Sequence, residues 1–295
     1  MTEGIVNILK PPGMTSSNVV SDVRRLFDLK RVGHTGTLDP GAAGVLPVCL
    51  GRATRLFDYL VDKEKEYIAE LAFGSCTDTQ DSYGHIVATS DRVIDEAELR
   101  AVLPSFLGEQ TQVAPKYSAL KSGGKAMYAL ARSGQEVPER IRPVTIHSLE
   151  FIAKTNENRF LIRIGCSRGT YIRTLCEDIG KRLSVCAHMS FLLRTAAGPF
   201  RVEDAYSIEE LAAQKEQGTL HSSIVPIPQA LSFLPNVTIG DNKALFRLQN
   251  GCVESVPGCA DLAENQSCLV YGNDELIGIG VFTPEGLKLK IHLGA

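Results

Sequence analysis

A single carboxylate, Asp39, stands in a glycine-rich stretch, GHTGTLDPGAAGVLPVCLGRATR, that spans residues 33–55. Its five glycines allow positive φ angles and let the backbone approach a ligand closely. Pro40 disfavours a helical conformation at Asp39. We therefore expect a constrained loop that holds a bound molecule against this carboxylate, which could act as a nucleophile or as a charge partner. The alternative is an ordinary turn in which Asp39 caps local backbone groups.

A second polar block, SRGTYIRT, precedes a pattern typical of a helix. Apolar residues recur at 172, 175, 179 and 183, which is one face of a helix. Thr170 is a candidate N-cap residue. This spacing predicts that Tyr171 and Arg173 lie in the first turn, where their side chains can project toward a cleft.

The elements that must position these residues alternate between strands and helices. We predict strands over 4–9, 65–73, 142–153 and 158–166, and helices over 50–60 and 95–107. A further helix is expected from Val19 to Phe27, with Ser16 or Ser17 as its cap, and another follows the capping box of Ser207 and Glu210. A proline-rich linker covers 224–235, and the short apolar segments after it show little helix signal. The length of the chain and this pattern predict two domains, 1–225 and a small β-rich domain at 231–295.

Positive charge is segregated along the chain, although the net charge is −3. Residues 159–201 hold eight Arg and Lys against two acids, and residues 115–147 hold six against two. Residues 231–295, in contrast, hold seven acids and four bases. The distribution of charge matters more than its sum for binding nucleic acid. The alternative is that basic surface helices produce such windows by chance.

Composition limits the compartment and the cofactors. The chain has eight cysteines but no C-x-x-C motif, which argues against a zinc site and indicates reduced thiols in the cytoplasm. The opening residues, MTEGIVNILKPP, do not form a signal peptide pattern. No apolar run approaches the roughly 20 residues of a membrane span, so we expect no contact with a membrane.

Five blocks of the sequence resemble one family. GHTGTLDPGAAGVLP is similar to the catalytic loop of bacterial tRNA pseudouridine-55 synthases of the TruB type. The motifs KPPGMTS, PKYSALK, SRGTYIRT and HMSFLLRTAAGPF resemble four further blocks of that family, at similar spacing. The resemblance covers roughly the first 200 residues well and the last 65 poorly.

The resemblance implies an α+β pseudouridine-synthase fold, with a mixed β-sheet, flanking helices and a small C-terminal PUA-like domain. It implies an isomerase that flips uridine 55 out of the T-loop of tRNA and converts it to pseudouridine, without metal or cofactor. The expected partner is the T-arm of tRNA alone. We expect a monomer that needs neither a guide RNA nor a protein partner.

The resemblance also assigns roles to residues. Asp39 is the catalytic residue, and Arg173 pairs with it and would keep it ionised. Residues that contact the base or fill the space it leaves are His34, Tyr67, Tyr171 and Leu192. A mobile arm around 112–145 would close over RNA, and the expected RNA-binding residues are Lys10, Lys116, Lys121, Lys125 and Arg132. The chain departs from the family at Leu193, where arginine is usual.

Three alternatives stay open at this point. A guide-dependent, dyskerin-type enzyme shares the motifs, but it would carry further basic segments that this chain does not show. The substrate could be an RNA other than tRNA, because the motifs do not name the nucleotide. From a different class, the protein could be an RNA-binding aid to tRNA folding, with catalysis secondary.

Overall fold

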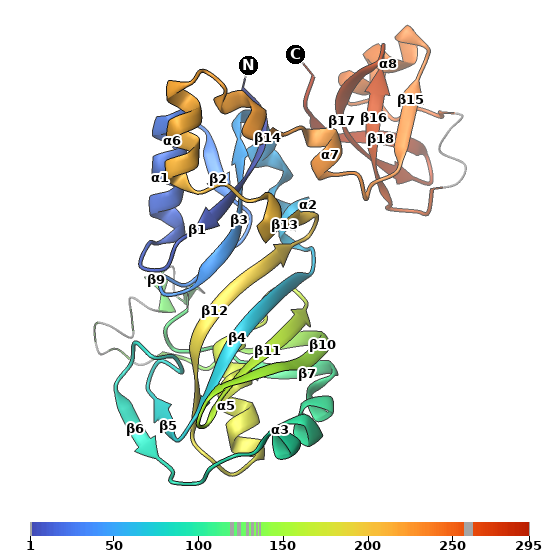
Figure 1. The fold of residues 1–295 in the computed structure, drawn as a ribbon. Helices are drawn as coiled ribbons and strands as arrows, with labels where there is room; N and C mark the ends of the chain where they lie inside the picture. Colours follow the sequence, from blue (N-terminus) through green and yellow to red (C-terminus); the bar gives the residue numbers. More distant parts are fainter. Residues whose placement is uncertain are drawn as a thin grey trace.

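One mixed sheet runs through the part of the chain before residue 226 (Figure 1). The computed structural model describes residues 2–118, 121–122, 125–127, 130, 133, 135, 137–256 and 262–294. Within these residues ten strands form the sheet, in the order β14-β1-β3-β12-β4-β11-β10-β7, with β2 paired to β3 and β13 to β12. The strands are β1 (Gly4–Lys10), β2 (Val32–His34), β3 (Ala43–Leu50), β4 (Lys65–Phe73), β7 (Gly108–Val113), β10 (Ile141–Asn156), β11 (Arg159–Cys166), β12 (Ala187–Ala197), β13 (Phe200–Arg201) and β14 (Ile224–Val225).

The four predicted strands are confirmed as β1, β4, β10 and β11. In β4, the side chains of Lys65, Tyr67 and Ala69 are buried while those between them are half-buried. A strand places successive side chains on opposite faces of a sheet, and this alternation expresses that rule. Because β4 lies between β12 and β11, Tyr67 reaches the middle of the sheet.

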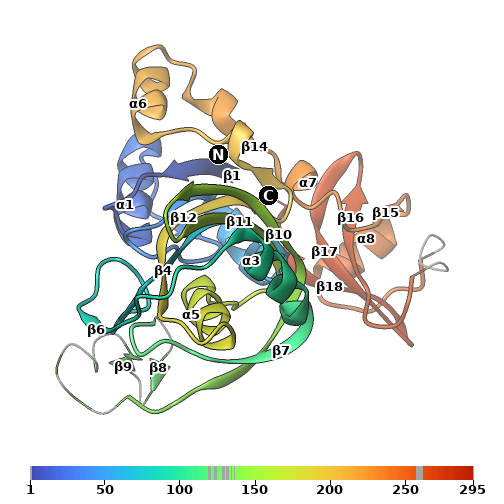
Figure 2. The same cartoon turned by 60° about the horizontal axis from the view of Figure 1, so that its bottom comes forward.

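Helices cover the sheet in two separate groups (Figure 2). The helix α5 (Ile172–Arg182) packs its apolar residues into one cluster with the residues of β4 and β11. The helix α1 (Ser16–Phe27) packs into a second cluster with β1 and β3, next to α6 (Ile208–Glu216). The loop that carries Asp39 connects these two regions, since it follows β2 and its Leu38 and Ala42 belong to the α5 cluster.

Two predicted helix caps are wrong by one or two residues. The cap of α1 is Thr15, whose hydroxyl accepts from the backbone N–H of Asn18, and not Ser16 or Ser17. The residue at the cap position of α5 is Tyr171, while the Thr170 hydroxyl donates to the Ser167 carbonyl. The capping box of α6 is confirmed in both directions. Tyr171 and Arg173 therefore sit at the very start of α5, where side chains face the loop of Asp39.

The other predicted helices are shorter than expected. Residues 50–60 form a 3-10 turn (Gly51–Leu56) and the helix α2 (Phe57–Val61). Residues 95–107 form α3 (Glu96–Val102), which gives way to a 3-10 turn (Leu103–Phe106) that contains Pro104. A proline disfavours continuation of an α-helix, so Pro104 accounts for the early end of α3. Between β4 and α3 lies a hairpin of β5 (Ser75–Thr77) and β6 (Ile86–Thr89).

The last 60 residues form a second sheet, in the order β15-β16-β17-β18. Its elements are β15 (Asn236–Ile239), α8 (Asn242–Gln249), β16 (Ser267–Gly272), β17 (Glu275–Thr283) and β18 (Gly286–His292). The β-rich character is confirmed, whereas α8 was not predicted. The expected linker holds β14 and a short helix, α7 (Ile227–Ala230), and an apolar cluster unites Leu231, Leu269 and Leu293 with Ile5 and Leu56. We keep the division into 1–225 and 231–295 as a proposal.

The expected arm overlaps the edge of the main sheet. Residues 112–113 and 141–145 belong to β7 and β10, which pair from Val113 and Ile141 onward. Between them, the described residues include a short pair, β8 (Lys121–Ser122) and β9 (Lys125–Ala126). Much of the remaining arm, including Arg132, lies outside the described residues. No helix in the described part of the chain is long and apolar enough to cross a membrane.

The contact between β3 and β12 generates a prediction about stability. Gly44 has a φ of +114°, and a Cβ added there would lie 2.2 Å from the backbone oxygen of Arg194. We expect Gly44→Ala to lower the free energy of unfolding by more than about 2 kcal/mol, because it combines backbone strain with overpacking. Urea denaturation would measure this loss. The control is Gly33→Ala, where no atom lies within 4 Å of the added Cβ. An equal effect of both substitutions would contradict the prediction.

Candidate active site

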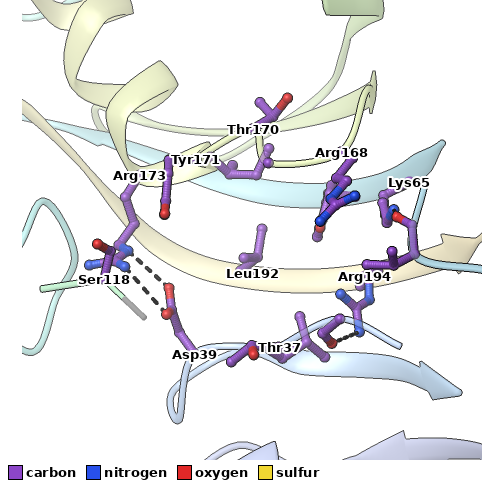
Figure 3. A pocket seen from close by; sticks show the side chains of 16 residues that line it. Thr37, Asp39, Lys65, Ser118, Arg168, Thr170, Tyr171, Arg173, Leu192 and Arg194 are labelled. Atoms are coloured by element: carbon purple, nitrogen blue, oxygen red, sulfur yellow. Dashed lines mark hydrogen bonds and ion pairs between the residues drawn. The ribbon is translucent and has the colours of Figure 1, made fainter. Parts of the chain in front are cut away.

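A pocket of about 210 Å³ opens between the Asp39 loop, β4, β12 and the start of α5. It is small beside the roughly 300–1,000 Å³ of pockets for drug-sized ligands, and it suits one nucleobase. Figure 3 shows Asp39 and Arg173 at one end, Leu192 in the middle, and Lys65, Arg168 and Arg194 at the other end. The pocket is lined by five of the predicted site residues: Asp39, Tyr67, Tyr171, Arg173 and Leu192.

The backbone beside Asp39 is fixed by groups from the start of the chain. The Ser16 hydroxyl donates to the Leu38 carbonyl at 3.1 Å and accepts from the Leu38 N–H at 3.0 Å. The Pro40 carbonyl accepts from the Gly13 N–H at 2.8 Å and from Lys10 Nζ at 3.2 Å. These contacts hold both neighbours of Asp39, so its carboxylate is presented from a rigid loop.

Lys10, which we expected to bind RNA, is buried in this structure. Its Nζ donates to the carbonyls of Pro11 and Met14 as well as Pro40, so all of its partners are backbone groups. Burial lowers the pKa of Lys10 to about 8, against the opposing effect of Asp39. Lys10 braces the loop, and it adds positive charge beneath the carboxylate.

Arg173 forms a two-pronged ion pair with Asp39. Its Nε lies 2.9 Å from Oδ2 and its Nη2 lies 3.3 Å from Oδ1. The Arg173 side chain is 5% exposed and that of Asp39 is 40% exposed, so the arginine lies behind a carboxylate that faces the opening. The guanidinium also donates to the Thr79 carbonyl at 3.2 Å and to the Tyr117 carbonyl at 3.1 Å. This fork-shaped geometry fixes the orientation of the carboxylate.

The charge of Asp39 reflects opposing influences. Burial raises the pKa of the Asp39 carboxyl above its ordinary value, and the carboxylate of Asp81 adds to that effect. Arg173, and to a smaller extent Lys10, lower the pKa, but they do not outweigh burial. Asp81 itself lies 3.8 Å from Arg173. The expected pairing with Arg173 is therefore present, yet the carboxylate remains easier to protonate than a free aspartate.

The far end of the pocket contains three cations that were not predicted. Arg194 is buried, and it donates to the Val45 carbonyl at 2.6 Å and to the Gly36 carbonyl at 3.1 Å. Lys65 is buried with its Nζ on the carbonyls of Val61 and Lys63, and burial lowers its pKa to about 8. Arg168 pairs with Asp62 at the surface. Arg194 lies within the HMSFLLRTAAGPF block, directly after Leu193, which is the signal that could have identified it.

Tyr67 lies beside Arg194 in the interior of the pocket. Burial raises the pKa of the Tyr67 hydroxyl, although Arg194 partly opposes this effect. The hydroxyl therefore stays protonated at neutral pH. A protonated phenol can stack on a base and donate a hydrogen bond, but it cannot accept a proton as a general base.

The other predicted residues do not line the pocket, or they lie outside the described residues. His34 does not line the pocket, and its Nδ1 accepts from the Gly36 N–H at 3.3 Å. Burial lowers the pKa of His34, so the ring is neutral at physiological pH. Lys116 is exposed. Lys121 and Lys125 are described only as backbone in β8 and β9, and Arg132 is outside the described residues.

The described residues include no cluster of His, Cys, Asp and Glu that could hold a metal ion. What the pocket offers is a carboxylate at its mouth, an apolar floor and positive charge at its far end. A carboxylate in such a place can attack an electrophilic carbon or stabilise a developing positive charge.

Comparison with known proteins identifies the family to which this chain belongs. Residues 24–172 match the N-terminal domain of the TruB family of pseudouridylate synthases, and residues 173–232 match the C-terminal domain of tRNA pseudouridylate synthase B. Relatives called tRNA pseudouridine synthase B include the protein of Pelotomaculum thermopropionicum, which is 47% identical over 94% of this chain and 90% of its own length. The protein of that name from Bacillus subtilis is 42% identical over 99% of this chain and 93% of its own length.

Solved structures share the fold. A chain of an H/ACA RNP bound to a substrate RNA containing 2'-deoxyuridine is 28% identical, with a TM-score of 0.76 over 99% of this chain and 85% of that chain. A chain of a Cbf5-Nop10-Gar1 complex is 31% identical, with a TM-score of 0.74 over 95% of this chain and 78% of that chain. The α+β pseudouridine-synthase fold is therefore confirmed.

The electrostatics of the site predict how neighbours change the titration of Asp39. Asp81→Asn removes a negative charge while keeping Oδ1, which accepts from Thr79 Oγ1 at 2.6 Å. We expect this substitution to lower the pKa of the Asp39 carboxyl, because a like charge disfavours the ionised form. Arg173→Gln should raise the pKa of the Asp39 carboxyl, because it removes a positive charge that favours the ionised form. NMR titration of 13C-labelled aspartate carboxyls would measure both shifts.

The matched control for this titration is Asp78→Asn. Asp78 lies on the same hairpin, where it pairs with His85 at 3.6 Å. The substitution Asp78→Asn should leave the titration of Asp39 unchanged. If Asp81→Asn and Asp78→Asn shift Asp39 equally, the effect comes from the general charge of the hairpin, and the assigned contact is wrong.

Proposed function

Because this chain belongs to the TruB family of pseudouridylate synthases, we propose that it converts uridine 55 in the T-loop of tRNA to pseudouridine, with Asp39 as the catalytic residue. Relatives that carry the name tRNA pseudouridine synthase B support tRNA as the substrate. The observation that carries the proposal is the ion pair of Asp39 and Arg173, at 2.9 Å, at the mouth of a pocket with room for one base.

The reaction is an isomerisation, so no atom is gained or lost overall. The bond between N1 of uracil and C1' of the ribose breaks, the base turns, and C5 joins C1' while the proton of C5 moves to N1 through acceptors in between. The uridine must first leave its stack, at a cost of a few kcal/mol. The ionised Asp39 supplies the nucleophile or the negative charge for the breaking bond, and Arg173 orients it.

The rest of the pocket supports a flipped nucleotide. Leu192 lies in the middle of the pocket, where it can form the floor beneath the base. Tyr67 and Tyr171 also line the pocket and offer aromatic surface to the base. The cations at the far end provide the positive potential that a phosphate backbone requires. We further propose that the chain acts as a cytoplasmic monomer, without guide RNA, metal or cofactor. The higher identity to the bacterial tRNA enzymes than to the chains of the RNP complexes supports this reading.

The decisive experiment maps pseudouridine in an unmodified tRNA transcript after incubation with the pure protein in EDTA. We expect one new pseudouridine, at position 55, and none in a transcript with cytidine at that position. Modification of a different position, or a requirement for added guide RNA, would contradict the proposal.

Asp39→Asn tests the catalytic assignment. The variant keeps the shape of the side chain but loses its charge, so we expect no pseudouridine even at saturating enzyme. Binding of tRNA should stay within a few-fold of the parent, because phosphate contacts supply most of the affinity. The control is Asp58→Asn, an exposed aspartate of α2 that should be fully active. Measurable turnover by pure Asp39→Asn would remove Asp39 from the chemistry.

Arg173→Lys tests whether geometry or charge matters more at the second residue. Lysine keeps the charge but not the planar fork that meets both oxygens of Asp39. We expect the single-turnover rate constant to fall by about 100-fold or more, since small misplacements of a catalytic group have effects of that order. Arg182→Lys, on the exposed end of the same helix, should react at the parental rate. A parental rate for Arg173→Lys would show that only its charge is needed.

A further inference from the structure

One exposed aromatic side chain packs against the loop that carries Asp39 and has no role in the chemistry above. Tyr83 lies in the turn between β5 and β6 and is 73% exposed. Ile86 and Val87, on the same hairpin, are each 65% exposed. Single exposed apolar residues are normal on a protein surface, so exposure alone assigns no role to any of these three side chains.

Tyr83 is also held in place. Its backbone N–H donates to Asp81 Oδ1 at 3.0 Å. Its ring lies directly on Gly41, since a Cβ added to that glycine would lie 2.1 Å from Cε2 of the ring. The absence of a side chain at Gly41 is thus what allows the ring to settle there. A large exposed ring that is fixed in this way loses little conformational entropy when it binds a partner.

The position of the ring places it beside the catalytic carboxylate. Gly41 follows Asp39 by two residues on the same loop, and Asp81 precedes Tyr83 by two residues and lies 3.8 Å from Arg173. Both views of the fold place the β5–β6 hairpin on the same side as β8 and β9 (Figures 1 and 2). A nucleotide next to the flipped uridine is joined to it by one phosphodiester, so it lies within reach of the Asp39 loop on which Tyr83 packs.

We propose that Tyr83 is a stacking platform for a base of the substrate RNA that adjoins the flipped uridine. One side of its ring packs on Gly41, and most of the remaining ring surface is open to solvent. Aromatic side chains bind unstacked bases of RNA loops in this manner, with little dependence on the identity of the base. Tyr83 is therefore a positioning residue that acts through affinity. This inference rests on the proposed function, because it requires that an RNA loop enters the pocket.

The test is single-turnover kinetics on a T-arm RNA over a range of enzyme concentrations. Tyr83→Ala should raise the enzyme concentration for half-saturation by about 5- to 100-fold, the range of one lost base stack. Tyr83→Phe keeps the ring and should match the parent. Tyr83→Leu keeps apolar bulk on Gly41 but lacks a flat face, so it should resemble Tyr83→Ala. The rate constant at saturation should stay within about two-fold of the parent in all three, because the stack exists before and during the reaction.

Two controls separate stacking from other roles. Ile86→Ala removes an equally exposed apolar side chain from the same hairpin and should bind as the parent does. An RNA that is abasic at the stacked position should bind the parent and Tyr83→Ala equally, since the interaction is then already missing. The abasic position that produces this result identifies the stacked nucleotide.

The outcomes are distinct. Parental affinity for Tyr83→Ala, or an equal loss for Ile86→Ala, overturns the stacking role. A lower saturating rate with unchanged affinity overturns it too, because it would mean that the ring merely shapes the Asp39 loop. A parent protein that forms no pseudouridine in the T-arm RNA refutes the proposed function instead.

Discussion

The guanidinium of Arg173 is the contact on which the site depends. It joins Asp39, the Thr79 carbonyl of the β5–β6 hairpin and the Tyr117 carbonyl beyond β7 to the start of α5. A buried charge is costly unless it is paired and hydrogen-bonded, and these partners supply that compensation. Four segments that are distant in the sequence must therefore be in place together before the charge is satisfied. The same requirement fixes the carboxylate at the mouth of the pocket.

A second buried arginine organises the opposite end of the pocket. Arg194 extends from β12 under the Asp39 loop, where it donates to the carbonyls of Gly36 and Val45. The close approach of β12 to β3 requires glycine at position 44. Together the two arginines bind the loop at Asp39 and at Gly36, while Lys10 and Ser16 bind the carbonyls of Pro40 and Leu38. The loop owes its rigidity to these long-range hydrogen bonds rather than to regular secondary structure.

The surroundings of Asp39 act on the pKa of its carboxyl in opposite directions. Burial and the nearby Asp81 raise the pKa of its carboxyl, while Arg173 and Lys10 lower it. A carboxylate that is partly desolvated is a better nucleophile than one fully surrounded by water, but it must stay ionised to act. The neighbouring cations favour the ionised form of Asp39, but they do not outweigh the effect of burial. Tyr67, in contrast, is a buried phenol whose raised pKa keeps its hydroxyl protonated.

The sequence by itself determined the elements whose signals are local. Alternation predicted β4 and β11, the capping box predicted α6, and glycine and proline predicted the loop of Asp39, because neighbouring residues alone set these preferences. Motif resemblance supplied Asp39 and Arg173, which are 134 residues apart and which no local pattern could join. Only the tertiary structure decided that Lys10 is buried, that Thr15 and Tyr171 occupy the cap positions, and that Arg194 and Lys65 line the pocket. Burial and cap choice depend on what packs against a residue from distant parts of the chain, and that information appears only when the sheet has formed.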